Sequence, residues 1–409
     1  MGLAPHNPQA CALTGEVDPP YALRPLAAAP RMRHKDDRNT PTGAAYLPPY
    51  VIKKGMVVII NNRQLLIKIV VCAAVIMSVV PVGACSSKPE PGLPNTRVRD
   101  DLLNTIITVT IYDDVEENVF EDIFDKISSI EKAMSANLPD SEISKAAAMA
   151  GRSPVVLSDE TYYVVKEAYD ISVESRGAFN LVIGPLVKLW GINTDSPRVP
   201  AQTEIDRALE LLDYNDVVLS DSDKSVYLAT EGMSIDLGAI AKGYAGDAAA
   251  AVARNHGVQN AVLDLGGNIV TIGGRPDGAA WRIGIRNPVI GESGYIAVLS
   301  IHNKSVVTSG GYERFFESDG HIYHHIFDSK TGYPADPGLL SVTVVSNSST
   351  DADRLSTVAF VLGVKDGMEF LKKYKDTEAI FITTDFEIYM TQGIKDLFML
   401  TDERFRVAS

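Results

Sequence analysis

Cysteine is scarce in this chain of 409 residues and is confined to one end of it. Cys11, Cys72 and Cys85 all lie in the first 85 residues, and none occurs in the remaining 324. That distribution excludes a disulfide framework and a cysteine-based metal site from the rest of the chain. With 45% hydrophobic and 22% charged residues, the chain can nevertheless bury a sizeable core.

Lysine and arginine are also fewer than aspartate and glutamate. The formal net charge is −14, and beyond residue 84 only 29 Lys and Arg residues face 48 Asp and Glu residues. Binding a polyanion requires clustered positive charge. We therefore expect no nucleic acid among the partners of this protein.

Residues 56–84 have the pattern of a secretory signal, which is carried by the stretch "NNRQLLIKIVVCAAVIMSVVPVGACSSKPEPG" (61–92). Arg63 and Lys68 form a positive start, residues 69–82 are apolar, and small residues precede Cys85. The alternative is a membrane-spanning anchor, but the apolar run is shorter than the ~20 residues that cross a bilayer. The stretch "VGAC" resembles the lipobox of bacterial lipoproteins, which implies a lipid-modified Cys85.

Composition divides the rest of the chain. Residues 1–55 are polar, rich in proline and without periodicity, so we expect a start-site artefact or a disordered segment, with Met56 as the better start. Residues 85–99 form a proline-rich tether, and residues 100–409 form the folded domain. The expected location is the extracytoplasmic side of a bacterial cell membrane, held by a lipid anchor.

Hydrophobic periodicity beyond residue 100 predicts an α+β fold with a largely antiparallel sheet, because runs of strands are separated from runs of helices. Helices are expected at 116–135, 158–175, 203–212, 239–255, 351–363 and 364–374. Strands are expected at 105–113, 217–220, 225–230, 260–273, 281–288, 295–302, 305–311, 321–328, 379–384 and 387–391. Gly184 and Pro185 predict a turn, and Gly257 should end the helix before it.

Two glycine-containing stretches are candidates for binding a ligand. In "DLGAIAKGYAGD" (236–247), glycines admit close approach, the start of a helix attracts anions, and Lys242 adds a positive charge. The alternative is an ordinary connection from a strand to a helix, with Lys242 in solvent. In "DLGGN" (264–268), paired glycines let the backbone approach a ligand or simply form a hairpin turn.

The stretch "YHHIFDSKTGYPAD" (323–336) contains two adjacent histidines. Neighbouring residues of a strand point to opposite faces, so only one of His324 and His325 can serve a given pocket. Alternatively, one histidine belongs to the core and the other lies in solvent. The turn "DSKTGYP" is rich in residues that fix a loop, which favours a site.

The stretch "DADRLSTVAF" (351–360) places Asp353 and Thr357 four residues apart on one helical face. That arrangement can present two oxygen ligands to a hard cation such as Mg²⁺. The alternative is that the Asp caps the helix and the Thr bonds to its own turn.

Taken in order, these stretches, together with "GAFNLVIGPLVKLWG", "WRIGIRNP" and "TSGGYERFF", resemble the ApbE family, the FAD:protein FMN transferases. The resemblance runs from about residue 104 to near the C-terminus. It implies a T-fold type domain of largely antiparallel sheets packed with helices, with FAD in a cleft between subdomains. It also implies Mg²⁺-dependent transfer of FMN from FAD to a Ser or Thr hydroxyl of an acceptor, releasing AMP.

The resemblance further implies roles for individual residues. Metal ligands would be Asp353, Thr357 and the carbonyl of Ala239, and His324 or His325 would be the base. FAD would be contacted by Ala178, Phe179, Asn180, Asp236, Lys242, Phe327, Leu103 and Asn137. Acceptors would be flavoprotein subunits of membrane redox complexes or other exported flavoproteins.

Three departures from the family pattern affect this interpretation. The family often has Asp in place of Asn180, and its "MGT" is Leu103, Asn104 and Thr105 here. A tyrosine often present in the family is replaced by Asn137, which would open the cleft near the adenine to water. Two alternatives therefore remain, a Mg²⁺-dependent FAD pyrophosphatase giving FMN and AMP, or a lipoprotein that binds FAD without catalysis.

Overall fold

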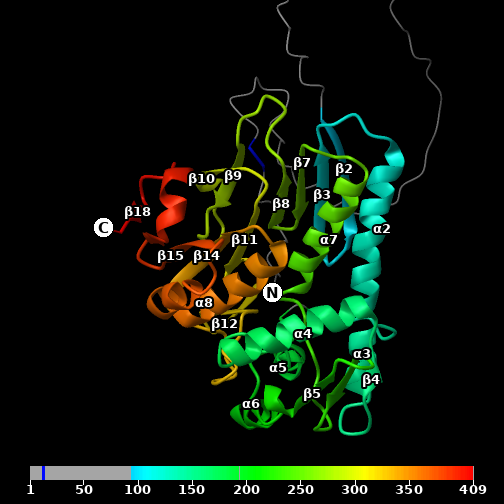
Figure 1. Ribbon diagram of the computed structural model, residues 1–409. Helices are drawn as coiled ribbons and strands as arrows, with labels where there is room; N and C mark the ends of the chain where they lie inside the picture. The colour runs from blue at the N-terminus through cyan, green and yellow to red at the C-terminus, as the bar shows by residue number, and fades with distance from the viewer. Residues whose placement is uncertain (1–11, 14–93, 193, 409) are drawn as a thin grey trace, which may run out of the picture. The chain divides into compact units, whose positions relative to one another are not determined.

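A nine-stranded sheet runs through the folded part of the chain in the computed structural model (Figure 1). The structure describes residues 12–13, 94–192 and 194–408. In order across the sheet, the strands are β18 (Arg406–Val407), β16 (Glu387–Met390), β15 (Glu378–Thr383), β14 (Leu339–Ser346), β11 (Ser305–Gly310), β8 (Asn268–Ile272), β7 (Ala261–Leu265), β3 (Thr105–Ile111) and β2 (Asn95–Leu102). All neighbours are antiparallel except β16 and β18, which confirms the predicted sheet type.

Both faces of this sheet are covered, so the fold has three layers. Helices α2 (Glu117–Met134), α7 (Ala241–Asn255) and α8 (Ser349–Leu371) lie side by side on one face (Figure 1). A second sheet of β1 (Ala12–Leu13), β9 (Trp281–Arg286), β10 (Tyr295–Ile301) and β17 (Phe398–Leu400) covers the other. Successive residues alternate between the two cores: Leu263 packs with the helices and Val262 packs with the second sheet.

A smaller subdomain follows α2 in the chain. It contains α3 (Glu142–Ala148), α4 (Asp159–Glu174), α5 (Gly184–Trp190), α6 (Gln202–Leu209), the 3₁₀ turn η1 (Tyr214–Asp216), and the sheet of β4 (Val155–Val156), β6 (Ser225–Leu228) and β5 (Val217–Ser220). The hairpin of β12 (Phe315–Ser318) and β13 (His321–His324) packs on it through an aromatic cluster around Trp190. A second 3₁₀ turn, η2 (Gln392–Leu397), precedes β17.

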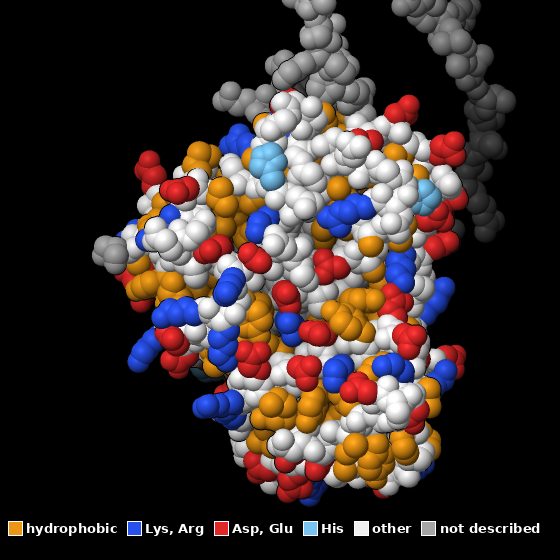
Figure 2. All heavy atoms as spheres, viewed as in Figure 1, with side chains coloured by type: hydrophobic (Ala, Val, Ile, Leu, Met, Phe, Trp, Pro, Cys, Tyr) orange, Lys and Arg blue, Asp and Glu red, His pale blue; other side chains and the backbone are white. Residues whose placement is uncertain are grey.

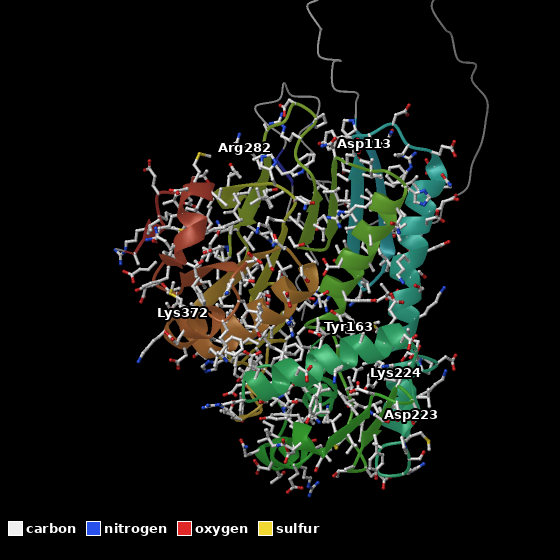
Figure 3. The ribbon with its side chains drawn as sticks, viewed as in Figure 1. Asp113, Tyr163, Asp223, Lys224, Arg282 and Lys372 are labelled. Carbon is white, nitrogen blue, oxygen red and sulfur yellow. The ribbon has the colours of Figure 1, made fainter. Side chains whose placement is uncertain are left out.

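Local signals correctly located several elements. Ser158 caps α4, where its hydroxyl accepts the Thr161 N–H at 3.3 Å. Gly257 follows the C-cap of α7 with φ +83°, a conformation that favours glycine. The turn between β5 and β6 contains Asp223 and Lys224, both labelled in Figure 3. Charged side chains of both signs are interspersed over the face drawn in Figure 2.

Other expectations require correction. β2 begins at Asn95, so residues 95–99 of the predicted tether belong to the sheet; none of their side chains is fully buried. Gly184 and Pro185 open the short helix α5 instead of only a turn, because proline is tolerated in a first turn. The helix α3 and the strands β4, β12, β14, β17 and β18 were not predicted.

The predictions for residues 56–84 and for Cys85, and nearly all of those for residues 1–55, lie outside the described residues. Among the residues that the structure does describe, no helix is both long and apolar enough to cross a membrane.

The start of α8 is fixed to α7 by one carboxylate. Asp247 of α7 accepts the backbone N–H groups of Ser349 at 2.8 Å and Thr350 at 2.9 Å. It also accepts the hydroxyl groups of Ser348 at 2.9 Å and Thr350 at 2.8 Å. Because the first N–H groups of a helix have no partner within the helix, a carboxylate from a neighbouring helix satisfies them and sets the position of α8.

Replacing this carboxylate should destabilise the fold. We expect Asp247→Ala to lower the free energy of unfolding by about 2–3 kcal/mol, because it leaves two helix N–H groups without an acceptor. The matched control is Asp122→Ala, which removes only a surface pair with His256 and should cost less than about 1 kcal/mol. Urea unfolding measures both, and equal losses would contradict the assigned role of Asp247.

Candidate active site

A cleft of about 1350 Å³ is lined by residues of the smaller subdomain, α7, α8 and the segment after β11. Its volume exceeds that of ordinary small-molecule pockets and suits a dinucleotide. The predicted site residues that line it are Leu103, Asn137, Ala178, Phe179, Asn180, Asp236, Ala239, Lys242, His325, Phe327, Asp353 and Thr357. The structure thus brings twelve of the thirteen predicted cleft residues together, and His324 is the exception.

The carboxylate of Asp353 joins α8 to the start of α7. Its Oδ2 accepts the backbone N–H of Gly243 at 2.8 Å, and its Oδ1 lies 3.7 Å from the Nζ of Lys242. The side chain of Asp353 is only 4% exposed. In a continuous helix the Gly243 N–H would donate to the carbonyl of Ala239. Here it donates to Asp353 instead, so the Ala239 carbonyl does not accept the helical hydrogen bond from Gly243.

Glycine at position 243 is required for this contact. A Cβ added there would lie 2.3 Å from the carbonyl oxygen of Ser349 and 2.6 Å from the Cβ of Asp353. Any other residue would push α7 and α8 apart. The sequence pattern "AKGYAGD" therefore encodes a close helix contact as well as a loop.

These groups fit a hard divalent cation. Asp353 supplies a carboxylate, Ala239 a carbonyl, and Thr357 a hydroxyl whose Oγ1 is 3.3 Å from that of Ser309. Within the described part of the chain, no group of three His, Cys, Asp or Glu side chains is placed to hold a metal. With a single carboxylate, the site is of the kind in which phosphate oxygens of the substrate complete the ligands of Mg²⁺.

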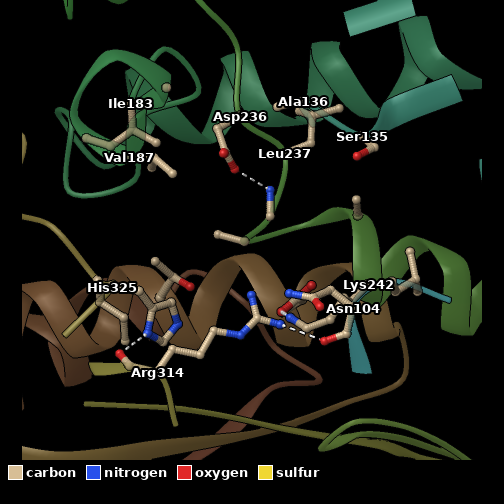
Figure 4. A pocket seen from close by; sticks show the side chains of 18 of the residues that line it. Asn104, Ser135, Ala136, Ile183, Val187, Asp236, Leu237, Lys242, Arg314 and His325 are labelled. Atoms are coloured by element: carbon tan, nitrogen blue, oxygen red, sulfur yellow. Dashed lines mark hydrogen bonds and ion pairs between the residues drawn. The ribbon is translucent and has the colours of Figure 1, made fainter. Parts of the chain in front are cut away.

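On another part of the cleft lining, His325 lies beside Arg314 (Figure 4). Its Nδ1 is 3.2 Å from the carbonyl oxygen of Arg314, which can only accept, so Nδ1 carries the proton and Nε2 is free to act as a base. Burial and the nearby charge of Arg314 lower the pKa of His325 to about 3. The ring is therefore neutral at neutral pH.

His324 is directed elsewhere. Its Nε2 is 2.9 Å from the carbonyl oxygen of Ala335, and its ring packs edge-on against Phe360. Burial lowers the pKa of His324 as well. Adjacent residues at the end of β13 thus point in different directions, and only His325 borders the cleft.

Charges of both signs line the cleft. The basic side chains are Lys188, Lys242, Arg286 and Arg314, and the acidic ones are Asp100, Glu131, Asp236, Glu313 and Asp353. Burial raises the pKa of Glu313, and the charge of Lys242 opposes that shift. Because carboxylates slightly outnumber basic groups, an anionic pyrophosphate in this cleft would need a further cation.

Asp264 of the "DLGGN" stretch does not itself line the cleft, although Gly266 and Gly267 do. Its Oδ1 accepts the Gly267 N–H at 2.9 Å, and burial raises its pKa to about 7. The stretch is the hairpin turn between β7 and β8, and the same turn borders the cleft.

The turn between β2 and β3 shows backbone strain. Leu103 and Asn104 have φ of +52° and +51°, and a branched apolar residue seldom adopts such a value. The Leu103 N–H is held at 2.9 Å by a carboxylate oxygen of Glu131. Because both turn residues line the cleft, the strain is located where the ligand would lie.

Asn180 and Asp236 are held by backbone groups. Asn180 donates to the carbonyl of Leu212 at 2.9 Å and accepts the Val182 N–H at 3.0 Å. An ionised aspartate has no N–H group and could not donate to the Leu212 carbonyl, which explains why asparagine stands at this position. Asp236 accepts the Gly238 N–H at 2.8 Å, and burial raises its pKa.

Several cleft residues were not predicted as site residues. Arg314 extends toward Asn104, with its Nη2 3.5 Å from that carbonyl oxygen (Figure 4). The guanidinium of Arg286 lies 5.3 Å from the ring centre of Tyr312. The stretches "WRIGIRNP" and "GGYERFF" contain these residues, but only the three-dimensional fold directs their charges into the cleft.

The chain is similar to known flavin transferases. Residues 103–381 match the model of the ApbE family. The chain is 37% identical over 306 residues to the FAD:protein FMN transferase of Klebsiella pneumoniae (strain 342), covering 75% of this chain and 95% of that protein. It is 39% identical over 298 residues to the enzyme of the same name from Treponema pallidum (strain Nichols), covering 70% and 82%.

Solved structures agree with these matches. The ApbE protein of Thermotoga maritima superposes with a TM-score of 0.69 at 30% identity, covering 75% of this chain and 99% of that one. The flavin transferase ApbE of Vibrio cholerae superposes with a TM-score of 0.67 at 25% identity, covering 75% and 100%.

Proposed function

This chain belongs to the ApbE family, and we propose that it transfers the FMN part of FAD to a Ser or Thr hydroxyl of an acceptor protein and releases AMP. The convergence of the α7–α8 corner and His325 on one cleft of dinucleotide size carries this proposal. Acceptors of the expected class are flavoprotein subunits of membrane redox complexes or other exported flavoproteins.

The transfer exchanges one P–O bond for another. The acceptor oxygen bonds to the phosphorus on the FMN side, the bond from that phosphorus to the bridging oxygen breaks, and AMP leaves with the bridging oxygen. Ala239, Asp353 and Thr357 would hold Mg²⁺, which neutralises charge on the pyrophosphate. Lys242 and Arg314 line the same cleft and would bind the phosphate oxygens.

In this scheme His325 takes the proton of the acceptor hydroxyl at Nε2, because Nδ1 is committed to the Arg314 carbonyl. A pKa of about 3 makes a weak base in the free protein. Burial is the main cause of the low pKa, and the charges of Arg314 and Lys242 add to it. An anion bound beside these two residues offsets their charges, so the pKa should rise when FAD is bound.

The two adjacent histidines provide a matched test. We expect His325→Gln to lower the rate of FMN transfer by about 10²–10⁴-fold, the range for loss of a general base. His324→Gln should lower it less than about tenfold, because that ring lies outside the cleft lining. Mass spectrometry of an acceptor incubated with FAD and Mg²⁺ measures the transfer; equal losses in both variants would overturn the assignment.

The pH profiles of the wild type give a second reading of the same base. The acid limb of the kcat/KM profile reports the free protein. Its midpoint should lie at a pH well below 6.5, the ordinary pKa of histidine. The acid limb of kcat should lie at higher pH, because bound pyrophosphate raises the pKa. Coincident limbs near 6.5 would contradict the environment described for His325.

Asn137 keeps the pyrophosphatase alternative open. Its side chain is exposed at the edge of the cleft, in the turn after α2, at a position where the resemblance to the family implies a tyrosine. If water reaches the pyrophosphate there, the wild type should release FMN and AMP from FAD and Mg²⁺ without an acceptor, and Asn137→Tyr should suppress that release. Chromatography of the products measures this release, and FAD binding by the variant is the control. If the wild type releases no FMN and AMP, the pyrophosphatase alternative is wrong. The protein is then a transferase if an acceptor is labelled, and an FAD-binding protein without catalysis if none is labelled.

We also propose that Cys85 carries a lipid that holds the domain on the extracytoplasmic side of the membrane, on the basis of "VGAC" and the apolar run before it. Cys85→Ala should move the protein that is still cleaved before residue 85 from the detergent phase to the aqueous phase in Triton X-114 partitioning. The wild type is the control, and a variant that stays in the detergent phase would indicate a retained apolar anchor.

A further inference from the structure

We propose that Lys242 and the divalent cation compete for the carboxylate of Asp353, so that FAD, by drawing Lys242 to its phosphates, strengthens binding of the cation. This inference rests on the proposed function and adds that bound FAD promotes binding of the cation. The Lys242 Nζ lies 3.7 Å from Oδ1 of Asp353, and no other side-chain cation among the described residues makes an ion pair with that carboxylate.

Burial makes a counter-charge necessary at Asp353. The side chain is 4% exposed, and a buried carboxylate without a partner is strongly unfavourable. The Gly243 N–H satisfies Oδ2, and Lys242 supplies the positive charge at Oδ1. A metal ion bound to the same carboxylate would place a second positive charge beside the ammonium group and would repel it.

Lys242 is able to leave this position. Its side chain is 24% exposed and lines the cleft, and a lysine has a flexible four-carbon stem. Burial raises the pKa of Glu313 and the charge of Lys242 opposes that rise, so the ammonium group of Lys242 lies among three acidic groups: Asp353, Glu313 and the phosphates of a bound substrate. The pyrophosphate offers the most charge of the three.

Competition at one carboxylate has a thermodynamic consequence. Without FAD, a cation must displace Lys242 into a cleft that offers it a weaker partner, which lowers the affinity of the cation. With FAD bound, Lys242 is already engaged, and the cation meets an unopposed carboxylate. By linkage, the cation must strengthen FAD binding by the same factor.

The experiment titrates the FAD-free protein with Mn²⁺, which prefers the same oxygen ligands as Mg²⁺, and measures free Mn²⁺ by EPR. We expect Lys242→Gln to bind Mn²⁺ about tenfold more tightly than the wild type, within the usual range of coupling between sites. Arg314→Gln is the matched control, since it removes a charge from the same cleft but not from Asp353, and should change the affinity less than about threefold.

Two further measurements separate the possible failures. In EDTA, where no turnover occurs, Lys242→Gln should bind FAD more weakly than the wild type. Unchanged or weaker Mn²⁺ binding by Lys242→Gln, with circular dichroism showing a folded protein, would overturn the competition and leave the transferase proposal intact. If Lys242→Gln does not fold, the same measurements are made on Lys242→Met, which keeps the apolar stem of the side chain.

Asp353→Asn tests the metal site itself and keeps an oxygen for the Gly243 N–H. It should abolish the tight binding of Mn²⁺ by Lys242→Gln when the two changes are combined. Tight binding that survives in the double variant would place the cation elsewhere, and would overturn both the competition and the proposed metal ligands.

Discussion

The close contact between α7 and α8 is the constraint on which the cleft depends. Gly243 allows the two helices to approach, and its N–H is held by Asp353 across the contact. Asp247 fixes the first turn of α8 from the same helix. Any loosening here would move the Asp353 carboxylate, the Thr357 hydroxyl and the Ala239 carbonyl relative to one another.

The charge of the cleft is determined by the acidic and basic side chains that line it. Carboxylates and basic groups both line the cleft, and the buried carboxylate of Asp353 has the ammonium group of Lys242 3.7 Å away. Such a lining does not attract a polyanion strongly by itself, which is consistent with a chain of net charge −14. Selectivity for a pyrophosphate would then arise from a cation and from movable basic side chains, more than from a fixed positive field.

A backbone carbonyl determines which nitrogen of His325 carries the proton. The strand end of β13 places two histidines side by side, and the hairpin returns the chain so that the Arg314 carbonyl meets only the second of them. The bond to Nδ1 sets the tautomer, while the Arg314 side chain sets the charge around it. One residue thus contributes twice, through its carbonyl and through its guanidinium.

The sequence by itself determined the elements whose signals are local. The spacing of apolar residues predicted α2, Ser158 predicted the start of α4, and the interval of four predicted that Asp353 and Thr357 share a helical face. The family motifs also identified thirteen candidate site residues, of which twelve line the cleft. These signals depend on neighbours within one or two turns, and the chain alone carries them.

Tertiary structure decided what depends on distant partners. Only the fold could choose His325 over His324, pair Lys242 with Asp353, or direct Arg314 and Glu313 into the cleft. The same holds for β2, whose mostly exposed side chains carry no periodic signal and whose pairing with β3 makes it a strand. The positive φ of Leu103 likewise belongs to the two-residue turn that pairs β2 with β3, and Glu131, 28 residues away, accepts its N–H.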